Sequence, residues 1–148
     1  DVNGTSTFQF VRNAPAYSGI HKRKYDTNTP DIEQINVELK TLDTLIPKDI
    51  KIDFIKIDVE GGEYGVLKGA LQLLKNRQPV VIFQSGLGAS EYYGTKPLEL
   101  YQFITKTAGL QISTLKSFIK QQSPLTEKEF ETHFNNNTEY YFTAHPKK

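Results

Sequence analysis

The stretch Ile52-Asp53-Phe54-Ile55-Lys56-Ile57-Asp58-Val59-Glu60-Gly61-Gly62 decides the fold. Its β-branched and aromatic residues predict a strand, because such side chains fit a pleated, packed surface. Gly61 and Gly62 end that strand, since glycine adopts backbone conformations that other residues avoid. Apolar residues then recur at helical spacing over residues 63–76, and the apolar run at residues 80–83 is typical of a strand covered on both faces. The centre of the chain therefore reads as strand, helix and strand.

The flanking sequence extends this unit into an α/β domain. We expect a long irregular connection at residues 12–36 and a single helical turn at residues 41–46. Further strands are expected at about residues 5–11, 110–115 and 139–144, and further helices at about residues 97–108 and 126–134. Strands separated by helices predict a mostly parallel sheet with right-handed crossovers, and the last strand is expected to be antiparallel.

The composition suits one soluble domain spanning residues 1–148. The chain is 37% hydrophobic and 24% charged, with a formal net charge of +1, so extensive disorder is excluded. The absence of Cys excludes disulfides and thiol nucleophiles. Acidic residues follow the basic cluster at residues 21–25, so we expect neither a nucleic-acid nor a membrane partner. No secretory signal precedes the first strand, which predicts a cytoplasmic protein.

The candidate chemistry lies where the first central strand ends. Lys56, Asp58 and Glu60 alternate along the chain and therefore share one face of that strand. If both faces are covered, such charges need pairing or a function. The two following glycines either let the backbone approach a ligand or serve only the turn. Pairing of the lysine with a neighbouring carboxylate at the sheet rim is the structural alternative.

These residues carry a resemblance to a known family. The chain resembles the FkbM family of S-adenosylmethionine-dependent methyltransferases, and the motifs that match are Thr41-Leu42-Asp43, residues 52–63, Val66-Leu67-Lys68-Gly69-Ala70 and the strand after Pro79. The resemblance implies a Rossmann-like class I methyltransferase sheet. It also implies methyl transfer to a hydroxyl oxygen of a sugar or natural product, so the expected partner is a small-molecule or glycan hydroxyl substrate.

The resemblance also implies site residues. Asp58 and Glu60 are the expected catalytic residues, with Lys56 pairing them or lowering the pKa of the acceptor hydroxyl. Asp58, Gly61 and Asp1 are expected to contact the cofactor. Substrate-side contacts are assigned to Gln84, Ser85 and His145, although the family usually has Glu where this chain has Gln84. No metal ligands are expected.

The N-terminal part of such a fold is not found in the sequence. No Gly-x-Gly loop opens a helix, and the chain has no Met, so we expect a C-terminal portion whose first central strand leaves an exposed edge. Residues 1–148 alone are therefore expected to bind S-adenosylmethionine weakly or not at all.

Two other readings remain open. Asp58, Glu60 and Glu63 form an all-oxygen set suited to Mg²⁺ or Ca²⁺ in a metal-assisted enzyme. Alternatively, the domain binds a sugar or protein without catalysis, through the loop at residues 85–93 and its Tyr92-Tyr93 pair.

Overall fold

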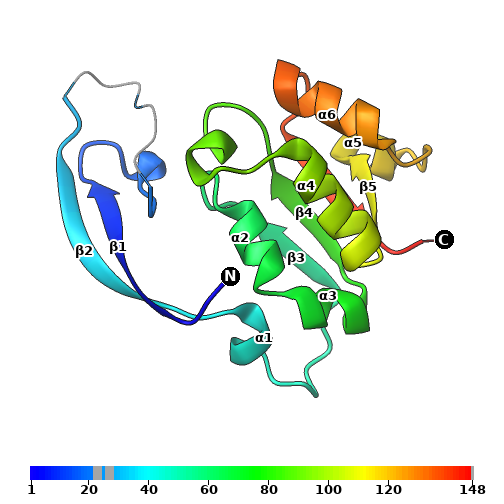
Figure 1. The fold of residues 1–148 in the computed structure, drawn as a ribbon, viewed down its shortest axis with the longest axis horizontal. Coiled ribbons are helices and arrows are strands. Elements are labelled where there is room, and N and C mark those ends of the chain that lie inside the picture. The colour runs from blue at the N-terminus through cyan, green and yellow to red at the C-terminus, as the bar shows by residue number, and fades with distance from the viewer. Residues whose placement is uncertain (22–24, 26–28, 148) are drawn as a thin grey trace.

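A computed structural model describes residues 1–21, 25 and 29–147. It contains a two-stranded sheet and a four-stranded sheet, joined through a short helix and a loop. Figure 1 shows the two-stranded sheet standing apart from the larger α/β unit. Residues 22–24 of the basic cluster lie outside the described residues.

The two-stranded sheet is an antiparallel hairpin of β1 (Gly4–Val11) and β2 (Ile32–Leu39), with Gly4 opposite Leu39 and Val11 opposite Ile32. The expected strand at residues 5–11 is confirmed. The expectation of an irregular connection at residues 12–36 is wrong for its last part, because β2 already begins at Ile32. Apolar residues alternate only from Ile35 to Leu39, so pairing with β1 extends the strand back to Ile32.

The four-stranded sheet has the order β3-β4-β6-β5, with β3 at Phe54–Ile57, β4 at Val80–Gln84, β5 at Gln111–Thr114 and β6 at Tyr141–His145. Strands β3 and β4 are parallel, whereas β6 pairs antiparallel with both β4 and β5. It follows that β3, β4 and β5 run in one direction and β6 runs in the other. The sheet is therefore mixed, and the expected antiparallel last strand is confirmed.

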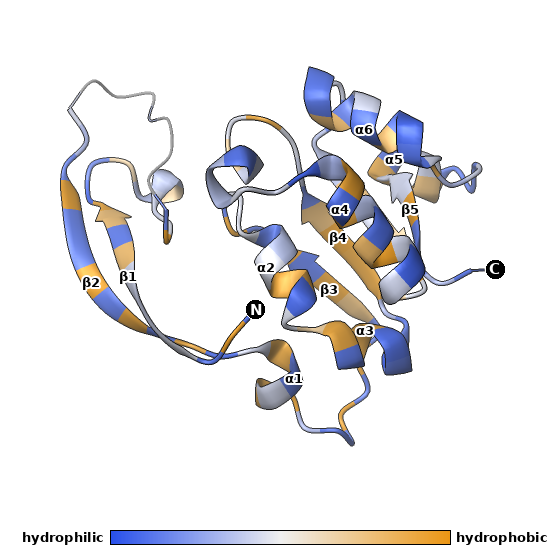
Figure 2. Ribbon diagram, viewed as in Figure 1, coloured by the Kyte–Doolittle hydropathy of each residue, from blue (hydrophilic) through white to orange (hydrophobic). Residues whose placement is uncertain are grey.

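One face of this sheet carries the core. Ile57, Val81 and Phe83 alternate with more exposed residues along β3 and β4, whereas β6 is buried from Phe142 onward. These residues belong to the same buried cluster as residues of the helices, namely Leu67, Leu74, Leu100, Ile104 and Phe130. Figure 1 shows α2, α3 and α4 in front of the sheet, and Figure 2 shows hydrophobic residues dominating β4. The covering elements are α2 (Glu63–Lys68), α3 (Leu71–Arg77), α4 (Pro97–Gln102), the π-helical turn Phe103–Thr107 and α6 (Glu127–Asn136).

The predicted helix at residues 63–76 is divided in two. It breaks at Gly69 and Ala70 between α2 and α3. The helical turn at residues 41–46 is confirmed as α1 (Leu42–Leu45), and the capping box at Thr126 that opens α6 is confirmed too. The helix α5 (Leu115–Ile119) was not expected; the Thr114 side chain caps its start.

Strand β3 lies at the edge of the larger sheet. Among the described residues it pairs with β4 alone, and Phe54 is 55% exposed. This arrangement confirms the expected exposed edge. In the part of the chain that the structure describes, no helix has the length and apolar character needed to cross a membrane.

Candidate active site

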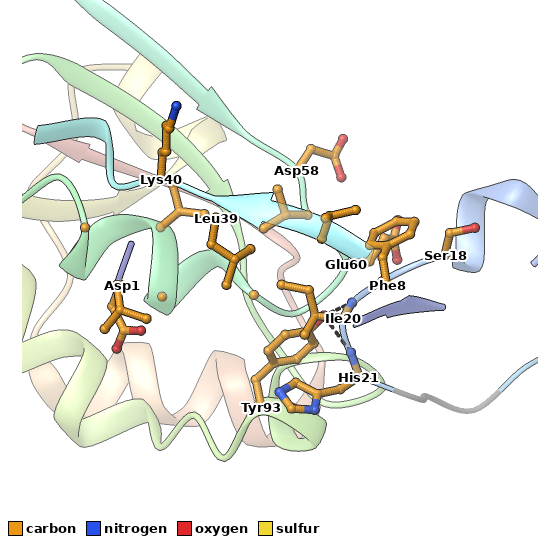
Figure 3. A pocket seen from close by; sticks show the side chains of 18 of the residues that line it. Asp1, Phe8, Ser18, Ile20, His21, Leu39, Lys40, Asp58, Glu60 and Tyr93 are labelled. Carbon is orange, nitrogen blue, oxygen red and sulfur yellow. Dashed lines mark hydrogen bonds between the residues drawn. The ribbon is translucent and has the colours of Figure 1, made fainter. Parts of the chain in front are cut away.

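A large cavity lies between the hairpin and the β3–α2 unit. Its volume is about 1040 Å³, at the upper limit of the ~300–1,000 Å³ common for small-molecule sites. Phe8, Val37 and Leu39 of the hairpin supply apolar lining, while Asp58 and Glu60 lie at the carboxyl end of β3 (Figure 3). The structure thus brings the two expected catalytic carboxylates together at one cavity.

Lys56 is paired with Asp58, as the structural alternative anticipated. Lys56 Nζ donates to Asp58 Oδ2 at 2.9 Å. This hydrogen bond, together with the negative charge of Asp58, raises the pKa of Lys56. The Lys56 side chain is 59% exposed, so its charge is solvated and needs no functional explanation. Lys56 does not line the cavity; Asp58 does.

Glu63 organises the turn between β3 and α2. The residue is only 2% exposed, and its Oε1 accepts hydrogen bonds from the backbone N–H groups of Val59 at 3.1 Å and Gly61 at 3.3 Å. Burial raises the pKa of this carboxyl, although the backbone hydrogen bonds oppose the shift. Glu63 therefore supplies an acceptor for two backbone N–H groups of the turn that precedes α2.

Gly61 is turned away from the cavity. It is buried with φ +108°, and an added Cβ would lie 2.5 Å from the backbone oxygen of Ala89 and 2.9 Å from Cδ2 of Tyr93. Gly61 packs against the loop after β4 and does not line the cavity, and its expected contact with a cofactor stays a prediction. Gly62, the next residue, lines the cavity.

The remaining expected residues are dispersed. Asp1 lines the cavity and pairs with Lys68, with Oδ2 and Nζ 2.5 Å apart. Gln84 donates to the hydroxyl of Tyr141 at 3.0 Å, and Ser85 is buried with no hydrogen-bond partner for its hydroxyl. Neither of the last two lines the cavity.

His145 lies at the other end of the sheet. Because β6 is antiparallel to β4, its last residue passes the beginning of β4, where Ala144 pairs with Val81. His145 Nε2 instead lies 3.0 Å from Ser113 Oγ, beside a second cavity of about 570 Å³. The structure therefore does not bring His145 together with Asp58.

Tyr93 lines the cavity and has a structural contact that sequence reasoning does not indicate. The sequence suggests only that Tyr92 and Tyr93 could stack on a ligand, which stays a prediction. Tyr92 is 42% exposed, but the Tyr93 hydroxyl accepts backbone hydrogen bonds from Ile20 and His21. These partners lie more than 70 residues away in the chain, and no local pattern indicates such a contact.

The three-carboxylate metal reading is not supported by the arrangement of side chains. Among the described residues, no three His, Cys, Asp or Glu gather so that they could hold a metal ion. Glu63 is occupied with the backbone of its own turn.

The fold and cavity define an α/β domain with carboxylates at the end of a parallel strand, where ligands of such sheets bind. Residues 2–112 match the family model described as the methyltransferase FkbM domain. The chain belongs to this family, and its function class is methyl transfer. Comparisons with curated proteins and with solved structures find no match.

Proposed function

We propose that this protein is an S-adenosylmethionine-dependent O-methyltransferase acting on a hydroxyl of a sugar or natural product. The observation that carries the proposal is the position of Asp58 and Glu60 on the large cavity of a domain that matches the methyltransferase family. A Rossmann-like class I sheet accords with β6 lying antiparallel between β4 and β5. We retain a cytoplasmic location as part of the proposal.

The cavity residues suit the cofactor chemically. S-adenosylmethionine supplies the methyl group on a cationic sulfonium and carries an aromatic base and ribose hydroxyls. Asp58 and Asp1 offer carboxylate acceptors for hydroxyls or amines, and Val66 on α2 offers an apolar surface for a ring. The volume of about 1040 Å³ leaves room for an acceptor as well.

The two kinds of side chain that line the cavity support the proposed class of methyl acceptor. Phe8, Val37 and Leu39 present apolar surface from the hairpin, and Asp58 and Glu60 present carboxylates from the strand end. Apolar side chains pack on the faces of sugar or polyketide-like rings, whereas carboxylates accept hydrogen bonds from hydroxyl groups. In this proposal Asp58 removes the hydroxyl proton as a general base and Glu60 orients the hydroxyl.

The test uses the natural polypeptide that contains these residues. We expect it to form S-adenosylhomocysteine from S-adenosylmethionine in the presence of a panel of hydroxylated sugars and natural products. Asp58→Asn keeps the shape of the side chain but removes its basicity, so we expect kcat to fall about 10²–10⁴-fold.

Asp53→Asn is the matched control, because the Asp53 side chain is 72% exposed, pairs with Lys51 and does not line the cavity. Turnover of the control should be unchanged. If Asp58→Asn binds the cofactor and turns over normally, Asp58 has no catalytic role. If the wild-type polypeptide binds no S-adenosylmethionine in calorimetry, the cofactor assignment is wrong.

A further inference from the structure

Tyr93 connects two backbone segments around the candidate active site through three contacts. We infer that Tyr93 is a positioning residue that sets one wall of the cavity, residues 19–21, relative to the turn that follows Asp58. This inference rests on the proposed function in one respect: the wall is taken to face the methyl acceptor. Gly19, Ile20 and His21 all line the same cavity as Asp58.

The first link joins Tyr93 to the connection between the hairpin strands. Its hydroxyl oxygen accepts the backbone N–H of Ile20 at 3.2 Å and that of His21 at 3.4 Å. The rings of Tyr93 and His21 meet edge to face, with centroids 4.5 Å apart and planes at 85°. Figure 3 shows the Tyr93 hydroxyl directed at this segment. One phenol therefore holds both the backbone and a side chain of the wall.

The second link joins Tyr93 to the turn after β3. An added Cβ at Gly61 would lie 2.9 Å from Tyr93 Cδ2, and one at Gly62 would lie 3.3 Å from Tyr93 Cε1. The ring thus occupies the space that side chains at these positions would need. This turn directly follows Asp58, and Glu63 also holds it through the backbone N–H groups of Val59 and Gly61.

The third link is a close approach at Gly19. A Cβ there would lie 3.1 Å from the Tyr93 hydroxyl oxygen. The segment can therefore approach the phenol because Gly19 has no side chain. Gly19 also pairs with Gln9 of β1 through two backbone hydrogen bonds, of 2.8 and 3.2 Å. Tyr93 is consequently connected through Gly19 to the hairpin that supplies the apolar wall.

The arrangement places the tyrosine between two parts of the cavity that different sheets supply. If the phenol sets their separation, removing its hydroxyl widens or loosens the acceptor wall while leaving Asp58 and Glu60 in place. The expected effect is on recognition of the acceptor, measured by KM, and not on the chemical step.

Amide hydrogen exchange of the natural polypeptide tests the contact directly. Tyr93→Phe removes the acceptor oxygen and keeps the ring, so we expect the Ile20 and His21 amides to exchange about fivefold faster. The amides of Val59 and Gly61, which Glu63 holds, should keep their rates. Tyr92→Phe is the matched control and should change none of these rates. Unchanged exchange at Ile20 and His21 in Tyr93→Phe would overturn the inference.

A double-mutant cycle tests the contact at Gly19 independently. Gly19→Ala should lower Tm in the wild-type background, because the new methyl group meets the phenol oxygen. In the Tyr93→Phe background the same change should lower Tm less, since the oxygen is gone. Equal effects in the two backgrounds would contradict the contact.

Methyl transfer gives the functional readout. With an accepted hydroxyl substrate, Tyr93→Phe should raise the acceptor KM about fivefold and leave kcat within about twofold. An active wild type whose acceptor KM is unaffected by Tyr93→Phe would overturn the positioning role. A wild type with no methyl transfer would contradict the proposed function instead, while exchange and the mutant cycle would still decide whether Tyr93 holds the wall.

Discussion

Glu63 shows how burial changes what an acidic residue does near this site. A carboxylate in the first turn of a helix is usually a solvated charge that favours the helix dipole. Here the side chain is folded back under the turn and accepts backbone hydrogen bonds from Val59 and Gly61. The position of Asp58 on the cavity therefore depends on a neighbour that does not itself line it.

The raised pKa of Glu63 predicts how stability depends on pH. Because burial raises this pKa above its ordinary value of 4.5, the fold favours the protonated form. That contribution is fully present below the unfolded pKa and is lost as pH rises through the folded pKa. Glu63→Gln stays neutral and keeps an acceptor oxygen. Its free energy of unfolding should therefore rise relative to that of the wild type as pH increases from 4.5 through the folded pKa of Glu63.

Urea unfolding at several pH values measures this difference. Glu131→Gln, an exposed change on α6, is the control and should follow the wild type. If the free energy of unfolding of the wild type instead rises relative to that of Glu63→Gln as pH increases, the hydrogen bonds outweigh burial at this carboxyl.

At the scale of elements, a side chain of α1 stabilises the start of another helix, α3. The carboxylate of Asp43 accepts the backbone N–H groups of Gln72 and Leu73, each at 2.9 Å. These groups lie in the first turn of α3, whose N-cap residue, Ala70, cannot accept them with its side chain. The Thr41-Leu42-Asp43 motif thus acts as a remote helix cap, and part of the family resemblance reflects folding.

Loss of this cap should be measurable. We expect Asp43→Ala to lower the free energy of unfolding by about 1–2 kcal/mol, because two N–H groups at the start of α3 lose a charged acceptor. Chemical denaturation checks this, with Asp53→Ala as the control, since the Asp53 side chain forms an exposed ion pair with Lys51. A cost no larger than that of the control would show that water replaces the carboxylate without loss.

At the scale of the whole molecule, the two sheets differ in how they are stabilised. Strands β4 and β6 carry fully buried residues, among them Val81, Phe83, Phe142 and Ala144. In the hairpin only Val11 and Gln9 are buried, and isolated two-stranded hairpins are marginally stable in water. The cavity lies between a well-packed unit and a weakly packed one.

This difference predicts the order of local opening. Backbone amides of β1 and β2 should exchange about tenfold faster than those of β4 and β6, because regions with little buried apolar surface open more easily. Hydrogen exchange followed by mass spectrometry resolves the two sheets. S-adenosylmethionine bound in the cavity should slow exchange in the hairpin more than in β4. Identical exchange in both sheets would show that the molecule opens as one unit.

The strand, turn, helix and strand between residues 52 and 84 could be predicted from the sequence, because hydrophobic period, glycine and capping residues act locally. The placement of Asp58 and Glu60 at a strand end followed from the same pattern. The start of β2 and the division of the predicted helix at Gly69 depend on pairing and packing with distant residues, so local patterns did not indicate them. For α5 the N-cap Thr114 is a local signal that the sequence reading missed.

The sequence by itself determined the family, the central unit and the carboxylates at the end of β3, since each is written in a continuous run of residues. Only the tertiary structure decided which side chains share the cavity. The antiparallel direction of β6 takes His145 to the far end of the sheet, and contacts across more than 70 residues bring Tyr93 to the wall. Both outcomes depend on how separate segments pack, and residue spacing along the chain carries no such information.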